Sequence, residues 1–102
     1  MANNDYTPQF LTAVAAIARR SENYWNAQAE RELASDRASR AYMAKSARDR
    51  ALEYRAIYFD AMATLDGCDA SLASLDAYFD TDHLCLWAEA EARVRAMGRA
   101  AA

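Results

Sequence analysis

The feature that most constrains the fold is a run from Gln9 to Asp66 that contains neither glycine nor proline. The whole chain of 102 residues has only two glycines and one proline. Folds built from strands need many turns, and turns draw heavily on these two residue types, so an all-β fold is excluded. A single helix over the whole run would span about 85 Å at ~1.5 Å per residue, which is too long for one small domain. The sequence therefore predicts helices, with at least one turn that uses neither glycine nor proline.

Alanine dominates the apolar composition. Apolar residues make up 54% of the chain; 26 of them are alanine, and 29 are larger residues, counting all tyrosines and cysteines. Alanine is the best helix former, and alanine-rich helices can pack closely. We expect one helical domain over 1–102 with a small core, a flexible tail at 1–7 and a frayed tail at 99–102.

The first long helix is expected to begin at Thr7 and Pro8, since threonine is a favoured N-cap and proline a favoured first helical residue. Its apolar face should hold Phe10, Leu11, Val14, Ile17, Ala18 and Trp25. After Leu33 the large apolar residues pause, and the segment ASDRASR offers several capping side chains. The turn is therefore expected near Ser35, and a second candidate break lies at 20–23.

A second long helix is expected from about Asp36 to Leu65, ended by Gly67 as a left-handed C-terminal cap. Its main stripe should hold Met43, Ala47, Tyr54, Ile57, Tyr58, Ala61 and Leu65. Leu52 and Phe59 lie on a different face, so this helix is apolar on two sides. A helix of that kind is central in a bundle or contacts another molecule. The pattern therefore also predicts, as an alternative function, a homo-oligomerisation or adaptor module.

Two shorter helices are expected to follow. Asp69 can cap a third helix from Ala70 to Phe79, and Asp80 or Thr81 can cap a fourth. The helical spacing of the fourth is carried by His83, Trp87, Ala90, Val94 and Met97. The predicted fold class is all-α: a small helical bundle of two long antiparallel helices, with two shorter C-terminal helices packed at their far end.

No motif predicts a catalytic, metal or cofactor site. The only histidine is His83, and Cys68 and Cys85 are far apart, so the paired ligands of a zinc site are missing. The two cysteines are expected to be partly buried apolar residues, and His83 to lie at the edge of the core. Asp66 comes directly before Gly67 without the alternating ligands of a calcium loop. We expect no cofactor, no metal and no enzymatic activity.

The apolar segment LTAVAAIA has Asp5 before it and Arg19 after it, which is the reverse of the charge order in a signal peptide. No apolar run approaches the length that spans a bilayer. A cytoplasmic protein without membrane contact is expected.

The charge layout is the least ordinary feature of the sequence. Residues 56–92 contain eight acidic residues and no lysine or arginine, whereas residues 19–55 contain nine basic and six acidic residues. Helix capping accounts for most of the aspartates but not for the missing positive charge. Charge of one sign on one surface serves solubility, or it meets an opposite charge on a partner.

We expect the acidic helical surface to dock on a basic groove of a nucleic-acid-handling protein, because proteins that bind the phosphates of nucleic acids commonly do so in basic grooves. The protein would then be a non-catalytic inhibitor or regulator, as a monomer or homodimer, that does not bind nucleic acid itself. Phages and mobile elements use small helical proteins of this general kind against host defence, and anti-CRISPR proteins are one such class. The residues expected to contact the partner are Asp66, Asp69, Asp76, Tyr78, Asp80, Asp82, Glu89 and Glu91.

Overall fold

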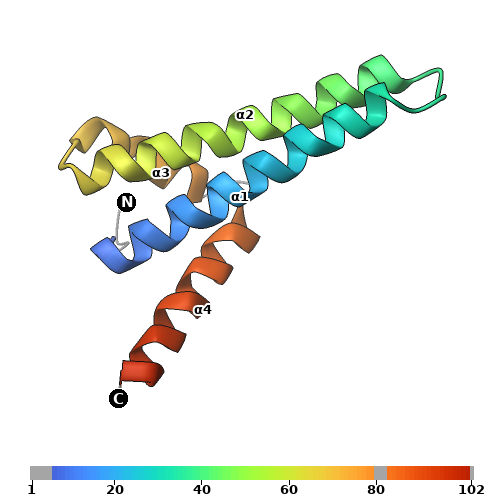
Figure 1. Ribbon diagram of the computed structural model, residues 1–102. Helices are drawn as coiled ribbons and strands as arrows, with labels where there is room; N and C mark the ends of the chain where they lie inside the picture. Colours follow the sequence, from blue (N-terminus) through green and yellow to red (C-terminus); the bar gives the residue numbers. More distant parts are fainter. Residues whose placement is uncertain (1–5, 80–82, 102) are drawn as a thin grey trace.

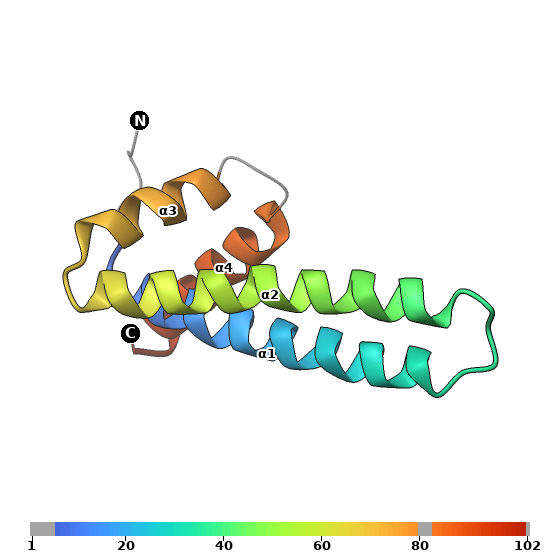
Figure 2. The same ribbon diagram turned by 90° about the horizontal axis from the view of Figure 1, so that it is seen from above.

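The structure is a computed structural model that describes residues 6–79 and 83–101. The described residues form four helices. These are α1 (Pro8–Leu33), α2 (Arg40–Leu65), α3 (Asp69–Phe79) and α4 (Leu84–Ala101). Figure 1 shows α1 and α2 as a long antiparallel hairpin, with α4 leaving it at a steep angle, and Figure 2 shows α3 folding back beside the end of α2. The predicted all-α class is confirmed, with two long helices followed by two shorter ones at the end opposite the hairpin loop.

The start of α1 and the end of α2 follow from local chemistry. The hydroxyl of Thr7 accepts a hydrogen bond from the backbone N–H of Phe10 at 3.1 Å, as an N-cap should. Gly67 has a φ of 91°, the left-handed conformation that glycine adopts without a steric penalty. The N–H of Cys68 then donates to the carbonyl of Ala63 at 3.0 Å. Both predicted caps are confirmed.

The turn between α1 and α2 occupies residues 34–39, as predicted near Ser35. The Ser35 hydroxyl donates to the carbonyl of Glu32 at 2.7 Å, and the Arg40 N–H donates to the carbonyl of Arg37 at 3.2 Å. Because these six residues form the turn, α2 begins at Arg40, and the predicted start at Asp36 is wrong. The alternative break at 20–23 is also wrong, since α1 runs through it without interruption.

The main core lies where all four helices meet. It contains the predicted face of α1 except Trp25, together with one side of α2, Leu75 of α3 and the first turns of α4: Phe10, Leu11, Ala13, Val14, Ala15, Ile17, Ala18, Ile57, Ala61, Leu75, Leu86, Trp87 and Ala90. Trp87 is 2% exposed and stacks on Phe10 with ring centroids 5.7 Å apart. This ring pair fastens α4 to the beginning of α1.

A second, smaller core holds the loop half of the hairpin together. It consists of Ala29, Ala44 and Ala47, with Trp25 packed against them. Small side chains let α1 and α2 approach closely, but they bury little area. Met43, predicted to face this core, is exposed, and its neighbour Ala44 is buried in its place. The hairpin consequently extends as a thin arm in a molecule that measures 51 × 32 × 21 Å.

The structure describes part of each predicted tail. Tyr6 stacks on Phe10 at 5.9 Å and lies 6.4 Å from the Trp87 ring, so the last part of the predicted tail at 1–7 packs on the core. Residues 1–5 lie outside the described residues. At the other end, α4 continues to Ala101, into the segment 99–102 that was predicted to fray.

In the described part of the chain, no helix combines the length and the apolar composition that crossing a bilayer requires.

Candidate functional site

The end of the molecule at which α2 turns into α3 carries aspartates, and its residues 56–79 include no lysine or arginine. Asp66 follows the last residue of α2, and Asp69 begins α3; both are exposed. Neither forms an ion pair with any described residue. Asp60 is half-buried on α2, and burial raises the pKa of its carboxyl group. We call Asp60, Asp66, Asp69 and Asp76 the acidic end.

Two of the predicted partner-binding residues on α3 are engaged within the chain. Asp76 accepts a hydrogen bond from the hydroxyl of Tyr6 at 2.7 Å. Tyr78 is half-buried, with its ring centroid 5.6 Å from that of His83. Burial, then the nearby carboxylates of Asp60 and Glu53, raises the pKa of the Tyr78 hydroxyl. These contacts fix α3 against the rest of the molecule and hold the acidic end in one place.

The two predicted residues on α4 lie in a different environment, next to arginines. Glu89 accepts two hydrogen bonds from Arg20, at 2.9 and 3.0 Å, and is 3.2 Å from Arg93. Glu91 is 3.7 Å from Arg95. The acidic segment of the sequence is therefore divided in space, with an acidic end at α2 and α3 and neutralised carboxylates on α4. The predictions at Asp80 and Asp82 lie outside the described residues.

The pair between Arg20 and Glu89 predicts a pH dependence of stability. The hydrogen bond from Arg20 lowers the pKa of the Glu89 carboxyl group in the folded state. The ion pair therefore stabilises the fold at pH values above the pKa that Glu89 has in the unfolded chain. This stabilisation is lost as the pH falls through the lower pKa of Glu89 in the folded protein. Because the Glu89 side chain is 38% exposed, solvent screens the interaction. We expect Glu89→Gln to lower the free energy of unfolding by at most ~1 kcal/mol at neutral pH, and we expect the difference from wild type to be smaller at about pH 3.

Urea unfolding of both proteins at the two pH values measures this difference. Glu91→Gln is the matched control, since Glu91 has only the single, longer contact to Arg95. A loss for Glu89→Gln that persists unchanged at the acidic pH would contradict the assignment.

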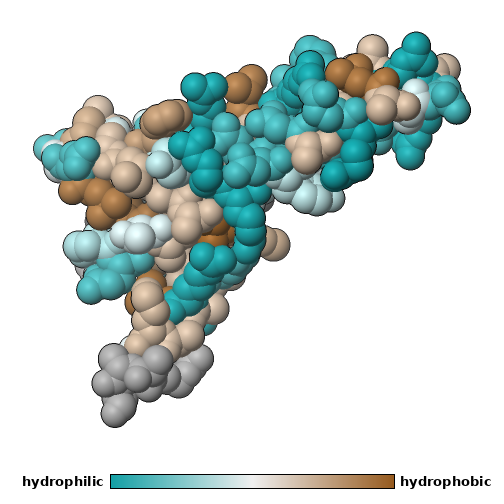
Figure 3. All heavy atoms as spheres, in the orientation of Figure 1, coloured by the Kyte–Doolittle hydropathy of each residue, from teal (hydrophilic) through white to brown (hydrophobic). Residues whose placement is uncertain are grey.

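A second surface is the outer face of α2. Leu52, Phe59 and Met62 are large apolar side chains that are 57%, 51% and 40% exposed. Arg55 lies among them, with its guanidinium 5.6 Å from the centroid of the Phe59 ring. Figure 3 shows apolar patches that interrupt the hydrophilic surface along its upper edge, where α2 runs in Figure 1. The sequence predicted the second apolar face from Leu52 and Phe59, but it missed Met62.

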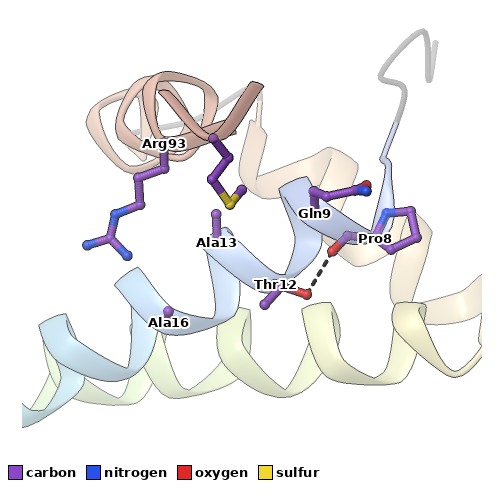
Figure 4. Close-up of a pocket in the computed structure, with 7 residues that line it drawn as sticks. Pro8, Gln9, Thr12, Ala13, Ala16 and Arg93 are labelled. Carbon is purple, nitrogen blue, oxygen red and sulfur yellow. Dashed lines mark hydrogen bonds between the residues drawn. The ribbon is translucent and has the colours of Figure 1, made fainter. Parts of the chain in front are cut away.

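A groove lies between the first turns of α1 and the outer part of α4 (Figure 4). It has a volume of about 520 Å³ and is lined by Pro8, Gln9, Thr12, Ala13, Ala16, Arg93 and Met97. The Thr12 hydroxyl donates to the carbonyl of Pro8 at 2.7 Å, and Arg93 is the one titratable side chain in the lining. Arg93 is already paired with Glu89. The groove therefore offers apolar contact but no group placed for acid–base or nucleophilic chemistry.

A smaller and more polar hollow of about 250 Å³ is lined by Arg50, Glu53, Tyr54 and His83. His83 is buried between the rings of Tyr54 and Tyr78, at 5.4 and 5.6 Å, as expected for a residue at the core edge. Its Nδ1 has no hydrogen-bond partner among the described residues.

Neither cysteine lies at this hollow, and both are exposed, so the prediction that they are partly buried is wrong. A hydrogen bond with the Ser71 side chain lowers the pKa of the Cys68 thiol. Within the residues that the structure describes, no three histidine, cysteine, aspartate or glutamate side chains gather as metal ligands would.

No known protein family, curated protein or solved structure matches this chain.

Proposed function

We propose that this protein is a non-catalytic binding protein that docks its acidic end on a basic surface of a nucleic-acid-handling protein and so inhibits or regulates it. The observation that carries the proposal is the pair of exposed aspartates, Asp66 and Asp69, at an end without lysine or arginine in residues 56–79. Like charges held close together repel one another, which destabilises the folded protein. Contact with a surface of opposite charge removes this repulsion. Basic surfaces are commonest on proteins that hold phosphates.

The contacts of α3 support the proposal. Asp76 is oriented by Tyr6, and Leu75 is fully buried against the core, so the aspartates sit on a helix of fixed position. A rigid charged surface loses little conformational entropy on binding. The carboxylates of α4 do not belong to this surface, because arginines neutralise them.

This mode of action is the one expected of the small proteins that phages and mobile elements direct against host defence. A CRISPR effector with an open basic groove is accordingly the first type of partner to test, and the complex would form in the cytoplasm.

The test compares two double variants with the same change in charge. Asp69→Asn with Asp76→Asn removes charge from the acidic end, while the asparagine amide oxygen can still accept the Tyr6 hydrogen bond. Asp36→Asn with Asp49→Asn removes the same charge at the loop end of the hairpin. Immobilised proteins are used to capture partners from a lysate of the source organism, and the captured proteins are identified by mass spectrometry.

We expect wild type and the loop-end variant to retain a basic nucleic-acid-binding protein that salt releases. The acidic-end variant should bind the purified partner at least ~10-fold more weakly, since complementary charge governs both encounter and specificity. Anisotropy of labelled nucleic acid should show that wild type displaces it from the partner. Equal binding by both double variants would overturn the proposal.

A further inference from the structure

The exposed face of α2 has the spacing of a coiled-coil seam. Six residues recur at intervals of four and three positions, which places them on one side of a helix. We call them the α2 stripe: Arg48, Leu52, Arg55, Phe59, Met62 and Asp66. At about 100° per residue, Leu52 lies opposite Ala61, which is fully buried in the core with Leu75 and Trp87. Leu52 and Met62 therefore lie on the side of α2 away from the core. At the edge of the α2 stripe, Arg48 pairs with Glu30 of α1 at 2.9 Å, and the Arg19 guanidinium of α1 lies 5.8 Å from the centroid of the Phe59 ring.

When two copies of the α2 stripe run antiparallel, residues of complementary chemistry lie opposite each other. If a second copy of α2 runs antiparallel, with the two-fold axis at the level of Ile57, Arg48 faces Asp66 of the second copy. In the same register Leu52 faces Met62, and Arg55 faces Phe59. Each contact occurs twice, because a two-fold interface is isologous. The contacts join opposite charges, two apolar side chains, and a guanidinium with an aromatic ring.

Other arrangements of two α2 helices are less favourable. A parallel pair would set Arg48 against Arg48, Arg55 against Arg55 and Asp66 against Asp66. Moving the antiparallel register by one heptad toward the acidic end sets Arg55 against Asp66 and Phe59 against Met62, but it leaves Leu52 and Arg48 beyond the end of the second α2 at Leu65. Moving it the other way sets Leu52 against Arg55. Only the register at Ile57 matches every position of the α2 stripe.

The charge of the whole hairpin favours the same orientation. Residues 19–55 carry nine basic and six acidic side chains, whereas all charged side chains of residues 56–79 are acidic. In an antiparallel pair, the acidic half of each α2 lies along the basic half of the other. Long-range attraction therefore supports the contacts within the α2 stripe.

We infer that the α2 stripe is the interface of an antiparallel homodimer with its two-fold axis at Ile57. The inference goes beyond the proposed function, since it concerns a second copy of this chain. The two surfaces share Asp66, which belongs to the acidic end and is the last residue of the α2 stripe. One helix from each copy makes a small interface, so we expect a dissociation constant of the order of 10 μM.

The test is a charge-reversal cycle on the full-length chain, followed by sedimentation equilibrium over concentrations well above and below that value. Arg48→Asp alone and Asp66→Arg alone each place two like-charge pairs in the interface, and each should weaken the dimer at least ~10-fold. Because Arg48 also pairs with Glu30 of its own chain, Glu30→Gln is a second control, which should leave the dimer intact. The double variant restores both pairs and should dimerise like wild type. A mixture of the two single variants should form a heterodimer, because each chain then meets its opposite charge at both ends of the α2 stripe.

The control is Arg31→Asp, which makes the same charge change at an exposed position of α1 outside the α2 stripe. It should leave dimerisation unchanged, and circular dichroism should show all variants as helical as wild type. A wild-type protein that stays monomeric throughout would overturn the inference and leave this face to another partner. A wild-type dimer that is not restored in the mixture would overturn the register. The capture experiment changes Asp69 and Asp76 and none of these residues, so the two proposals fail separately.

Discussion

Replacing Trp87 with alanine is expected to lower the free energy of unfolding by about 3–5 kcal/mol, the largest loss that we expect from any truncation to alanine in the described core. Trp87 is 2% exposed and stacks on Phe10, and its Nε1–H donates to the carbonyl of Tyr78 at 3.3 Å. The indole thus joins α4 to the start of α1 and to the end of α3. Its removal leaves a cavity where these helices meet, and the sparse alanine core of the arm cannot compensate for it.

Urea unfolding followed by circular dichroism measures the loss, and Met97→Ala is the matched control on the same helix. Met97 is exposed, so its truncation should change stability by less than ~0.5 kcal/mol. Trp87→Phe keeps a ring to stack on Phe10 but loses the N–H donor, and its stability should lie between those of wild type and Trp87→Ala. A loss below ~1 kcal/mol for Trp87→Ala would show that α4 is not anchored by this side chain.

The helices could be predicted from the sequence because their limits depend on neighbouring residues. Thr7 caps the N–H of a residue three positions later, and Gly67 supplies a left-handed conformation that other residues rarely adopt. The turn near Ser35 was visible as a pause in the apolar pattern. The first residue of α2 was harder to predict. Ser35 precedes Asp36 and Ser39 precedes Arg40, and the two serines are equally suitable as N-cap residues.

The division of the acidic segment could not be predicted, because it depends on contacts between distant residues. Arg20 and Glu89 are 69 residues apart, and Tyr6 and Asp76 are 70 apart. Nothing in the local pattern around Glu89 indicates that α4 crosses α1 at Arg20. Residues of like charge that are close in sequence therefore form an acidic end at α2 and α3 and a neutralised face on α4.

The α2 stripe was partly visible in the sequence, through Leu52 and Phe59. The roles inferred for Arg48 and Asp66 require knowledge of which side of α2 is exposed, because both residues also fit an ordinary solvated face, and Arg48 pairs with Glu30 of α1. In the inferred dimer, each Asp66 lies nine residues beyond the two-fold axis, so the two acidic ends are about 27 Å apart along α2. Two linked acidic ends would bind a partner with repeated basic sites more tightly than one.

Leu75→Ala is expected to have the second largest effect, a loss of about 2–5 kcal/mol in the free energy of unfolding. Leu75 is fully buried, and it is the one side chain of α3 in the described core. Because α3 packs mainly on α2, the loss of this anchor should release α3 before the hairpin unfolds. Hydrogen exchange should therefore speed up in the amides of α3 more than in the middle of α1 and α2.

Leu72→Ala is the control within α3, since Leu72 is only half-buried and its truncation should lower the free energy of unfolding by less.

The pair of variants also tests whether the acidic end needs a fixed shape. Leu75→Ala leaves every charge in place, so a surface that attracts its partner by net charge alone would bind as well as wild type. A surface that docks as a rigid helix would lose affinity in Leu75→Ala and keep it in Leu72→Ala. Equal exchange rates in α3 of Leu75→Ala and wild type would contradict the role of Leu75 as its anchor.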